Sequence, residues 1–344
     1  MLSAKQEISA NLLSYIMQPF TITSARDNLS AIKALSENQK ARVIGGGTNL
    51  LDLMKMYVEK PDQLIDINHL PLTLIHTEPT GAMRIGALVR NSDLAYHEGV
   101  KKHYPVLSQA LLSGASPQIR NMATVGGNLL QRTRCPYFFN TSFPCNKRRP
   151  GSGCPAINGF NRSHAILGTS DKCIATHPSD MAVALLALEA VVVIQNDKSE
   201  RKIPIDSFYT LPGDNPEIET VLQHDELITA IELPAVSTNT KSHYLKVRDR
   251  ASFEFALTSA AVVMEVTDGT IRSARIALGG VGTKPWRAIE AEQVLQGAAD
   301  NPQTYRLAAG ASLKNARPLK YNAFKIELAK RSIIRALETT GGIS

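Results

Sequence analysis

The cysteines of this 344-residue chain are confined to one short segment, as Cys135, Cys145, Cys154 and Cys173. This segment, residues 131–173, is rich in Pro, Gly, Arg and Asn, and it shows no sustained hydrophobic periodicity. An irregular stretch of this length inside a compact domain usually has a functional reason. Four thiolates can supply the ligands of a Cys₄ zinc site or of a [4Fe–4S] cluster. The segment therefore predicts a metal site around which the chain is wrapped.

The spacing of the cysteines does not identify the metal. The gaps of 9, 8 and 18 intervening residues contain no close C-x-x-C pair, which counts against a zinc ribbon and also differs from ferredoxin runs. Disulfides would need an oxidising compartment, and the N-terminus shows no signal peptide. Unrelated buried thiols would be scattered along the chain. The pattern favours a metal site over both of these alternatives and leaves iron–sulfur and zinc open.

Two glycine loops point to a second ligand. Gly45-Gly46-Gly47-Thr48-Asn49 separates a predicted strand from a predicted helix, and its glycines allow backbone N–H groups to converge on a phosphate. A side chain at Gly46 would then enter the path of the phosphate. The spacing fits neither the Rossmann nor the P-loop motif, so a tight turn is the alternative. Because residues 124–128 (TVGGN) repeat the pattern, the two loops together indicate a long, bent, phosphate-containing ligand.

Composition narrows the class of protein. Hydrophobic residues make up 43% of the chain and charged residues 20%, which is typical of a globular protein. No apolar run approaches the roughly 20 residues that span a bilayer, so no membrane insertion is predicted. The most apolar stretch, Met181–Ile194, is interrupted by Glu189 and predicts a buried helix that leads into a strand.

The net charge of +7 is partly concentrated around the cysteines. No RNA-binding aromatic signature or helix-turn-helix pattern accompanies this charge, so nucleic acid is not the predicted partner. An acidic partner subunit or an anionic cofactor is the favoured reading. The basic cluster consists of Arg132, Arg134, Lys147, Arg148 and Arg149.

The order of predicted elements divides the chain. From Met17 to about residue 68, strands alternate with helices, and Ser24 begins an S-x-x-D sequence that predicts a helix start. Residues 71–234 mix strands and helices, including a strand over 83–88 and a helix over 106–113 that Gly114 ends. After a Pro/Ser/Thr/Asn-rich linker at 234–243, strands are followed by helices, which predicts an α+β domain.

Five motifs in order resemble one family: RVIGGGTNLLDLM (42–54), ATVGGNLLQRTRCPYF (123–138), ATHPSDMAVAL (175–185), KVRDRASFEFAL (246–257) and ALGGVGTKPWRA (277–288). They resemble the FAD-binding subunits of xanthine dehydrogenase-type molybdenum hydroxylases, from about Met17 to the C-terminus. The cysteine segment is similar to that of the FAD subunits of bacterial periplasmic aldehyde oxidoreductases, which carry a [4Fe–4S] cluster; hydroxybenzoyl-CoA reductase has a comparable extra cluster.

The resemblance implies an α+β fold in two domains. A PCMH-type FAD-binding domain of two α/β subdomains would span residues 17–238, with the iron–sulfur insert at 131–175. A C-terminal α+β domain of the CO dehydrogenase flavoprotein type would span 239–344. Residues 1–16 would be an N-terminal extension.

The resemblance also implies roles for individual residues. Asp180 matches the acidic residue beside the flavin dinucleotide, although its place near a helix start would also favour the helix dipole. Lys246 matches a lysine near the isoalloxazine ring; without the family it would be read as a solvated strand residue. The cysteines Cys135, Cys145, Cys154 and Cys173 match the cluster ligands. The remaining FAD contacts are Arg42, Val43, Ile44, Gly45, Gly46, Gly47, Thr48 and Asn49 in the first loop, and Thr124, Gly127 and Asn128 in the second.

The implied function is electron transfer within a heterotrimer. Substrate would be oxidised at a molybdenum cofactor in a large subunit, and electrons would cross two [2Fe–2S] clusters in a small subunit, reach FAD on this chain and leave to an external acceptor. No catalytic nucleophile or general base is predicted on this chain. The rival readings are a self-sufficient FAD oxidase and a zinc-stabilised binding protein. Without a signal peptide of its own, the chain would reach the periplasm by co-export with a partner bearing a twin-arginine signal, or would stay in the cytoplasm.

Overall fold

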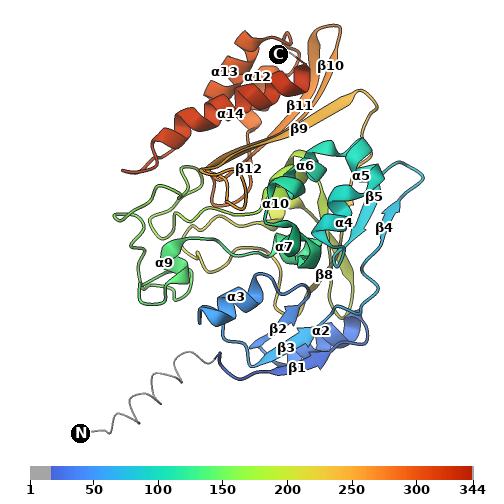
Figure 1. Cartoon of the computed structure of the whole chain (residues 1–344), viewed down its shortest axis with the longest axis vertical. Helices are drawn as coiled ribbons and strands as arrows, with labels where there is room; N and C mark the ends of the chain where they lie inside the picture. The colour runs from blue at the N-terminus through green and yellow to red at the C-terminus, as the bar shows by residue number, and fades with distance from the viewer. Residues whose placement is uncertain (1–16, 343–344) are drawn as a thin grey trace.

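The computed structural model describes residues 17–342, and the predicted extension at 1–16 lies outside them. Three sheets follow one another along the chain, each with its own helices (Figure 1). The mixed α+β architecture predicted from the sequence is confirmed. None of the helices in this part of the chain is both long and apolar enough to cross a membrane.

The first sheet is small and parallel. Its strands β1 (Thr21–Ser24), β2 (Ala41–Ile44) and β3 (Gln63–Asp66) lie in the order β1-β3-β2, connected by α2 (Asn28–Glu37) and α3 (Leu50–Lys55). The apolar face of α2, formed by Ala31, Ile32 and Leu35, is buried.

The start of α2 differs from the S-x-x-D prediction. Asp27 is the N-cap, because its carboxylate accepts from the Ser30 backbone N–H at 2.7 Å, while the Ser30 hydroxyl accepts from the Asp27 N–H at 3.0 Å. This reciprocal capping box satisfies two backbone donors that a helix start leaves unpaired. Ser24 instead ends strand β1.

The second sheet is antiparallel, with the order β4-β5-β8-β6-β7. The predicted helix that ends at Gly114 is confirmed as α6, and the apolar stretch 181–194 divides as predicted into α10 and β6. The strands are β4 (Ile75–Thr77), β5 (Met83–Gly86), β6 (Val191–Gln195), β7 (Glu200–Pro204) and β8 (Leu227–Leu233). The helices are α4 (Asn91–Tyr96), α5 (Glu98–His103), α6 (Pro105–Ser113), α7 (Pro117–Met122), α8 (Val125–Leu129), α10 (Asp180–Ala187) and α11 (Ile205–Phe208).

The cysteine segment is irregular, as predicted. Between α8 and α10 the chain forms one short helix, α9 (Pro136–Phe139), and otherwise turns and extended stretches. In Figure 1 this segment forms the long loops around α9, beside the C-terminal domain. Its small apolar cluster joins Phe138 and two of the cysteines to Leu53 of α3.

The central strand β10 of the third sheet is packed on both faces. The alternating side chains of β10 divide between two cores: Ala261 and Val263 pack with α10, whereas Ala260 and Val262 pack with the C-terminal helices. The C-terminal domain therefore shares a core with the preceding one. The antiparallel strands, in the order β12-β11-β10-β9, are β9 (Thr240–Val247), β10 (Thr258–Thr267), β11 (Thr270–Gly279) and β12 (Trp286–Arg287), and the helices are α12 (Ile289–Leu295), α13 (Pro302–Ser312) and α14 (Phe324–Gly341).

Candidate FAD cleft and cysteine site

A cleft of about 770 Å³ lies where the regions built on the three sheets meet. Its walls come from the loop after β2, the loops around α7 and α8, the start of α10, and the segment that follows β9. All of the residues predicted to contact FAD line this single cleft: Arg42, Val43, Ile44, Gly45, Gly46, Gly47, Thr48, Asn49, Thr124, Gly127, Asn128, Asp180 and Lys246.

The two glycine loops contact each other. Thr124 caps α8, because its hydroxyl oxygen accepts from the Gly127 N–H at 3.2 Å. A Cβ atom placed at Gly45 would lie 3.3 Å from this Thr124 oxygen. A Cβ atom at Gly46 would lie only 1.9 Å from the backbone oxygen of Met122. The expectation that a side chain at Gly46 would enter the path of the ligand is therefore wrong. Glycine is needed there because the backbones of the two loops are in close contact.

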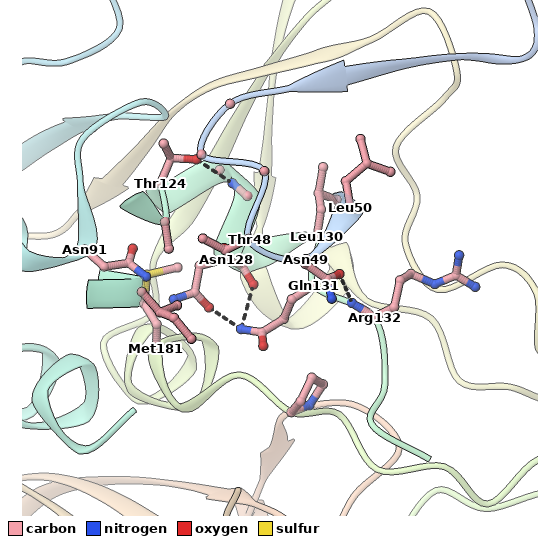
Figure 2. Close-up of a pocket in the computed structure, with 18 of the residues that line it drawn as sticks. Thr48, Asn49, Leu50, Asn91, Thr124, Asn128, Leu130, Gln131, Arg132 and Met181 are labelled. Carbon is pink, nitrogen blue, oxygen red and sulfur yellow. Dashed lines mark hydrogen bonds between the residues drawn. The ribbon is translucent and has the colours of Figure 1, made fainter. Parts of the chain in front are cut away.

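Side-chain amides hold the loops together (Figure 2). The Asn49 side-chain oxygen accepts from the Arg132 N–H at 3.0 Å. The Asn128 side-chain oxygen accepts from Gln131 Nε2 at 2.5 Å. It also accepts from the Ser179 hydroxyl at 2.7 Å. The second loop is thus tied to the start of α10, and Arg132, four residues after that loop, is tied to the first loop.

Two buried side-chain amide atoms of the cleft lack a partner. The Asn49 Nδ2 atom and the Asn91 Oδ1 atom are sealed from solvent, and no hydrogen bond reaches either one within residues 17–342. Both residues line the cleft, where Figure 2 shows their side chains. Buried polar groups are rarely left unsatisfied, so a donor and an acceptor await a ligand. A dinucleotide offers groups of both kinds, and the residues present therefore fit FAD.

A buried ion pair joins the two domains at the cleft. Lys246 on β9 lies with its Nζ atom 2.8 Å from Asp180 Oδ2 and 3.1 Å from the Ser113 backbone oxygen. The Lys246 side chain is only 3% exposed, so the reading of a solvated strand residue is wrong. Asp180 is the first residue of α10, as its sequence position indicated, and Ser179 is the N-cap of this helix.

Tyr244 belongs to the same group and was not singled out from the sequence. Its hydroxyl donates to Asp180 Oδ1 at 2.5 Å. Burial, followed by the charge of Asp180, raises the pKa of Tyr244 well above its usual value. The available signal was the period of two along a strand, which places Tyr244 on the same face as Lys246.

The basic cluster is turned largely inward. Arg132 Nη1 lies 2.8 Å from Glu59, Arg134 lies 3.1 Å from Asp52, and Lys147 lies 2.9 Å from Glu219. Arg148 donates to the backbone oxygens of residues 137 and 140, each at 3.2 Å. These internal partners account for four of the five cations, so the cluster is mainly a structural feature of the chain and not an open docking face for an acidic partner.

Glu219 is the half-buried acid shared by Arg132 and Lys147 in this network. Burial alone would raise its pKa, but the charges of Arg132 and Lys147 hold the pKa below its usual value. Arg132 also lies over the Phe138 ring, 5.0 Å from the ring centroid. The network therefore connects the glycine loop, through Asn49 and Arg132, with the cysteine segment.

The four cysteines surround one small cavity. Cys135, Cys145, Cys154 and Cys173 all line it; the first and last are buried, the other two half-buried, and none forms a disulfide. No carboxylate lines the cavity. Within residues 17–342 no three Cys, His, Asp or Glu side chains form a ready-made metal-binding group. The structure thus brings the four thiols to one place without closing them into a finished ligand set.

Backbone N–H groups accompany the sulfurs. Burial raises the pKa of Cys135 to about 12, and hydrogen bonds from the backbone of Phe138 and Tyr137 oppose this shift. The Ala175 N–H lies 3.5 Å from Cys173 Sγ. Donors directed at sulfur stabilise the thiolate form, which is the form that binds metal.

The C-terminal helix α14 anchors the cysteine segment. Lys325 is completely buried, and its Nζ atom donates to the backbone oxygens of Ser163, His164 and Gly280 at 2.9, 3.0 and 2.7 Å. The amide of Asn322 donates to the oxygen of Ala165 at 3.2 Å. His164, which these contacts hold, lies with Nε2 3.1 Å from Cys135 Sγ.

Comparison with known proteins defines the class. Residues 18–236 match the family model described as the FAD binding domain in molybdopterin dehydrogenase, and residues 243–340 match the CO dehydrogenase flavoprotein C-terminal domain. The chain belongs to the FAD-binding subunits of the xanthine dehydrogenase family of molybdenum hydroxylases. It is therefore an oxidoreductase subunit, with the PCMH-type and CO dehydrogenase-type fold that the resemblance implied.

Individual relatives agree with this class. The chain is 52% identical to the aldehyde oxidoreductase FAD-binding subunit PaoB of Escherichia coli K12, over 92% of this chain and 96% of that protein. It is 29% identical to the glyceraldehyde dehydrogenase medium chain of Sulfolobus acidocaldarius, over 80% of each. Among solved structures, a carbon monoxide dehydrogenase from Hydrogenophaga pseudoflava superimposes with a TM-score of 0.76 and 26% identity, covering 95% of this chain and 99% of that one.

Proposed function

We propose that this chain is the FAD-carrying electron-transfer subunit of an aldehyde oxidoreductase. One observation carries the proposal: both glycine loops and every residue predicted to contact FAD line one cleft large enough for a dinucleotide. The aldehyde specificity is supported by the 52% identity to an aldehyde oxidoreductase subunit over nearly the whole chain. The substrate-oxidising site itself is assigned to a partner chain.

FAD supplies chemistry that side chains lack, since it exchanges electrons singly or in pairs. The chain's own residues bind and orient it. The backbone of the two glycine loops would hold the phosphates, and the unpaired amide atoms of Asn49 and Asn91 would supply further polar contacts. The paired charges of Asp180 and Lys246 fix one wall of the cleft across the domain boundary.

The cysteine site is assigned to a [4Fe–4S] cluster. Four thiols line one cavity that no carboxylate enters, and backbone N–H groups approach the sulfurs. This donor set suits iron–sulfur better than a hard cation. A cluster ligated there would give partners to four cysteines that form no disulfide.

The partners follow from the same assignment. A molybdenum-cofactor large subunit and a [2Fe–2S] small subunit would deliver electrons, and an external acceptor would remove them. Export to the periplasm would occur together with a partner that carries a twin-arginine signal. Fractionation of cells that co-express all three chains tests the export; recovery of the assembled complex in the cytoplasm alone would exclude it.

The decisive experiment is an absorption spectrum of protein purified without oxygen, before and after dithionite reduction, together with iron and zinc analysis. Flavin bands over a broad iron–sulfur absorption, both bleached by dithionite, are expected. Flavin bands with zinc instead of iron would retain the FAD assignment and replace the cluster. A colourless protein that binds no added FAD would overturn the assignment of the cleft.

A further inference from the structure

We propose that His164 is a positioning residue of the cysteine site, whose ring N–H donates a hydrogen bond to the Cys135 sulfur and raises the reduction potential of the bound cluster. The inference rests on the [4Fe–4S] assignment made above. His164 is not one of the predicted metal ligands, and it lies 29 residues from Cys135 in the sequence.

The geometry assigns the proton to the nitrogen that faces sulfur. His164 is 2% exposed, and its Nε2 atom lies 3.1 Å from Cys135 Sγ. Its other ring nitrogen, Nδ1, is buried and has no hydrogen-bond partner within residues 17–342. A cysteine that ligates iron is a thiolate and can only accept, so Nε2 must be the donor.

The backbone around the ring is held in place from three directions. The His164 N–H donates to the Asn161 oxygen at 3.0 Å, and the His164 oxygen accepts from Lys325 at 3.0 Å. The neighbouring Ala165 N–H donates to the Ile174 oxygen at 2.9 Å, next to Cys173. The backbone is therefore fixed beside Cys135, and the 2% exposure of His164 leaves its ring little room to turn away from the sulfur. His164 and Cys135 are 2% and 9% exposed, so water has little access to the contact between Nε2 and Sγ.

A hydrogen bond at this position has a predictable effect on redox behaviour. Reduction adds negative charge that is shared by the cluster and its ligand sulfurs. A donor aimed at a ligand sulfur stabilises the reduced form more than the oxidised form, so it raises the potential. The effect is specific to the cluster and should leave the flavin potential unchanged.

The test compares three variants of the full chain, each purified anaerobically with its complex: His164→Leu, His164→Gln and the exposed control His103→Leu. Iron per chain is measured first, and the cluster potential is then followed by redox titration with electron paramagnetic resonance. We expect His164→Leu to make the reduction potential of the cluster more negative than in wild type. His164→Gln should recover part of the lost potential, because its amide N–H can replace the ring donor. His103→Leu should have the wild-type potential.

The outcomes separate the two levels of the proposal. A wild-type complex with no iron beyond that of the [2Fe–2S] clusters of its small subunit would overturn the [4Fe–4S] assignment, and the role of His164 with it. Full iron with an unchanged potential in His164→Leu would overturn only the hydrogen-bond role. If His164→Leu loses iron, retention of iron at near wild-type potential in His164→Gln supports the donor role. If both His164 variants lose iron while flavin content and secondary structure stay intact, His164 would be a ligand of the metal, and the hydrogen-bond role would be overturned.

Discussion

Lys246 on β9 and Asp180 at the start of α10 form an ion pair with 2.8 Å between Nζ and Oδ2, across the boundary between the FAD-binding and C-terminal domains. The two side chains are 3% and 9% exposed, so water does not screen the pair. An ion pair of this kind adds little over well-packed apolar residues, but removal of one member strands the other charge in the interior. The pair therefore couples the docking of the domains to the integrity of the cleft.

Replacement of Lys246 by Met should destabilise the protein by about 3 kcal/mol, because Asp180 is left buried and unpaired. The same variant should retain less FAD after gel filtration. The double variant Lys246→Met with Asp180→Asn should recover part of the stability, as measured by urea unfolding. A double variant no better than the single one would show that packing, and not the charge pair, supplies the effect.

Gly46→Ala should disrupt the contact between the two glycine loops. Its Cβ atom would lie 1.9 Å from the Met122 oxygen, so the backbone must shift, at a cost of about 1–3 kcal/mol. Bound flavin, measured by absorbance after denaturation, should fall strongly. Gly45→Ala is the matched control, because its Cβ atom would lie 3.3 Å from the Thr124 hydroxyl oxygen. This variant should lose less flavin than Gly46→Ala. Equal flavin content in the two variants would contradict the loop-contact argument.

Cys154→Ser should remove most of the iron while FAD stays bound. Cys154 lines the cysteine cavity but not the FAD cleft, so the two cofactors should respond separately. Iron analysis and flavin absorbance on the same sample check this expectation. Iron content equal to wild type would show that the ligand set is wrong.

Lys325→Met should loosen the cysteine segment from α14. The substitution removes three hydrogen bonds and leaves backbone oxygens in the interior without donors, which should cost about 3 kcal/mol of unfolding free energy. Iron should be lost on incubation with a chelator faster than from wild type. The exposed Lys314→Met is the control and should change neither property. Chelator resistance equal to wild type would argue against the anchoring role.

His177 should make stability depend on mild acid. Burial lowers the pKa of this histidine to about 4, and its Nε2 atom is sealed from solvent. Because an unfolded histidine titrates near 6.5, the unfolded state binds a proton that the folded state does not between pH ~6.5 and ~4. Stability should therefore fall as the pH falls through this window, by up to about 3 kcal/mol.

The comparison of His177→Phe with wild type isolates this contribution. Urea midpoints at pH 7 and pH 4.5 should lie closer together in the variant, whatever its absolute stability. The exposed His103→Gln variant should keep the wild-type difference. An identical pH dependence in His177→Phe and wild type would assign the acid sensitivity to other groups.

Local sequence patterns were sufficient for the parts of this protein that depend on neighbouring residues. The glycine loops, the helix that ends at Gly114, the division of residues 181–194 into helix and strand, and the irregular cysteine segment all follow from composition and period over a few residues. The resemblance to the family then predicted FAD contacts that all line the cleft. The predicted start of α2 at Ser24 was nevertheless wrong. Two candidate cap residues, Ser24 and Asp27, lie within four residues, and Asp27 forms the capping box.

Contacts between distant residues were decided by tertiary structure alone. Asp180 and Lys246 are 66 residues apart, and Lys325 is 161 residues from His164, so no local period links them. The same holds for the Met122 oxygen that requires glycine at position 46, and for the acids that turn the basic cluster inward. A sequence records which residues can hydrogen-bond or bind metal. Only the packing of elements from separate parts of the chain determines which partners they meet, because burial and distance, not residue type, set the strength of each contact.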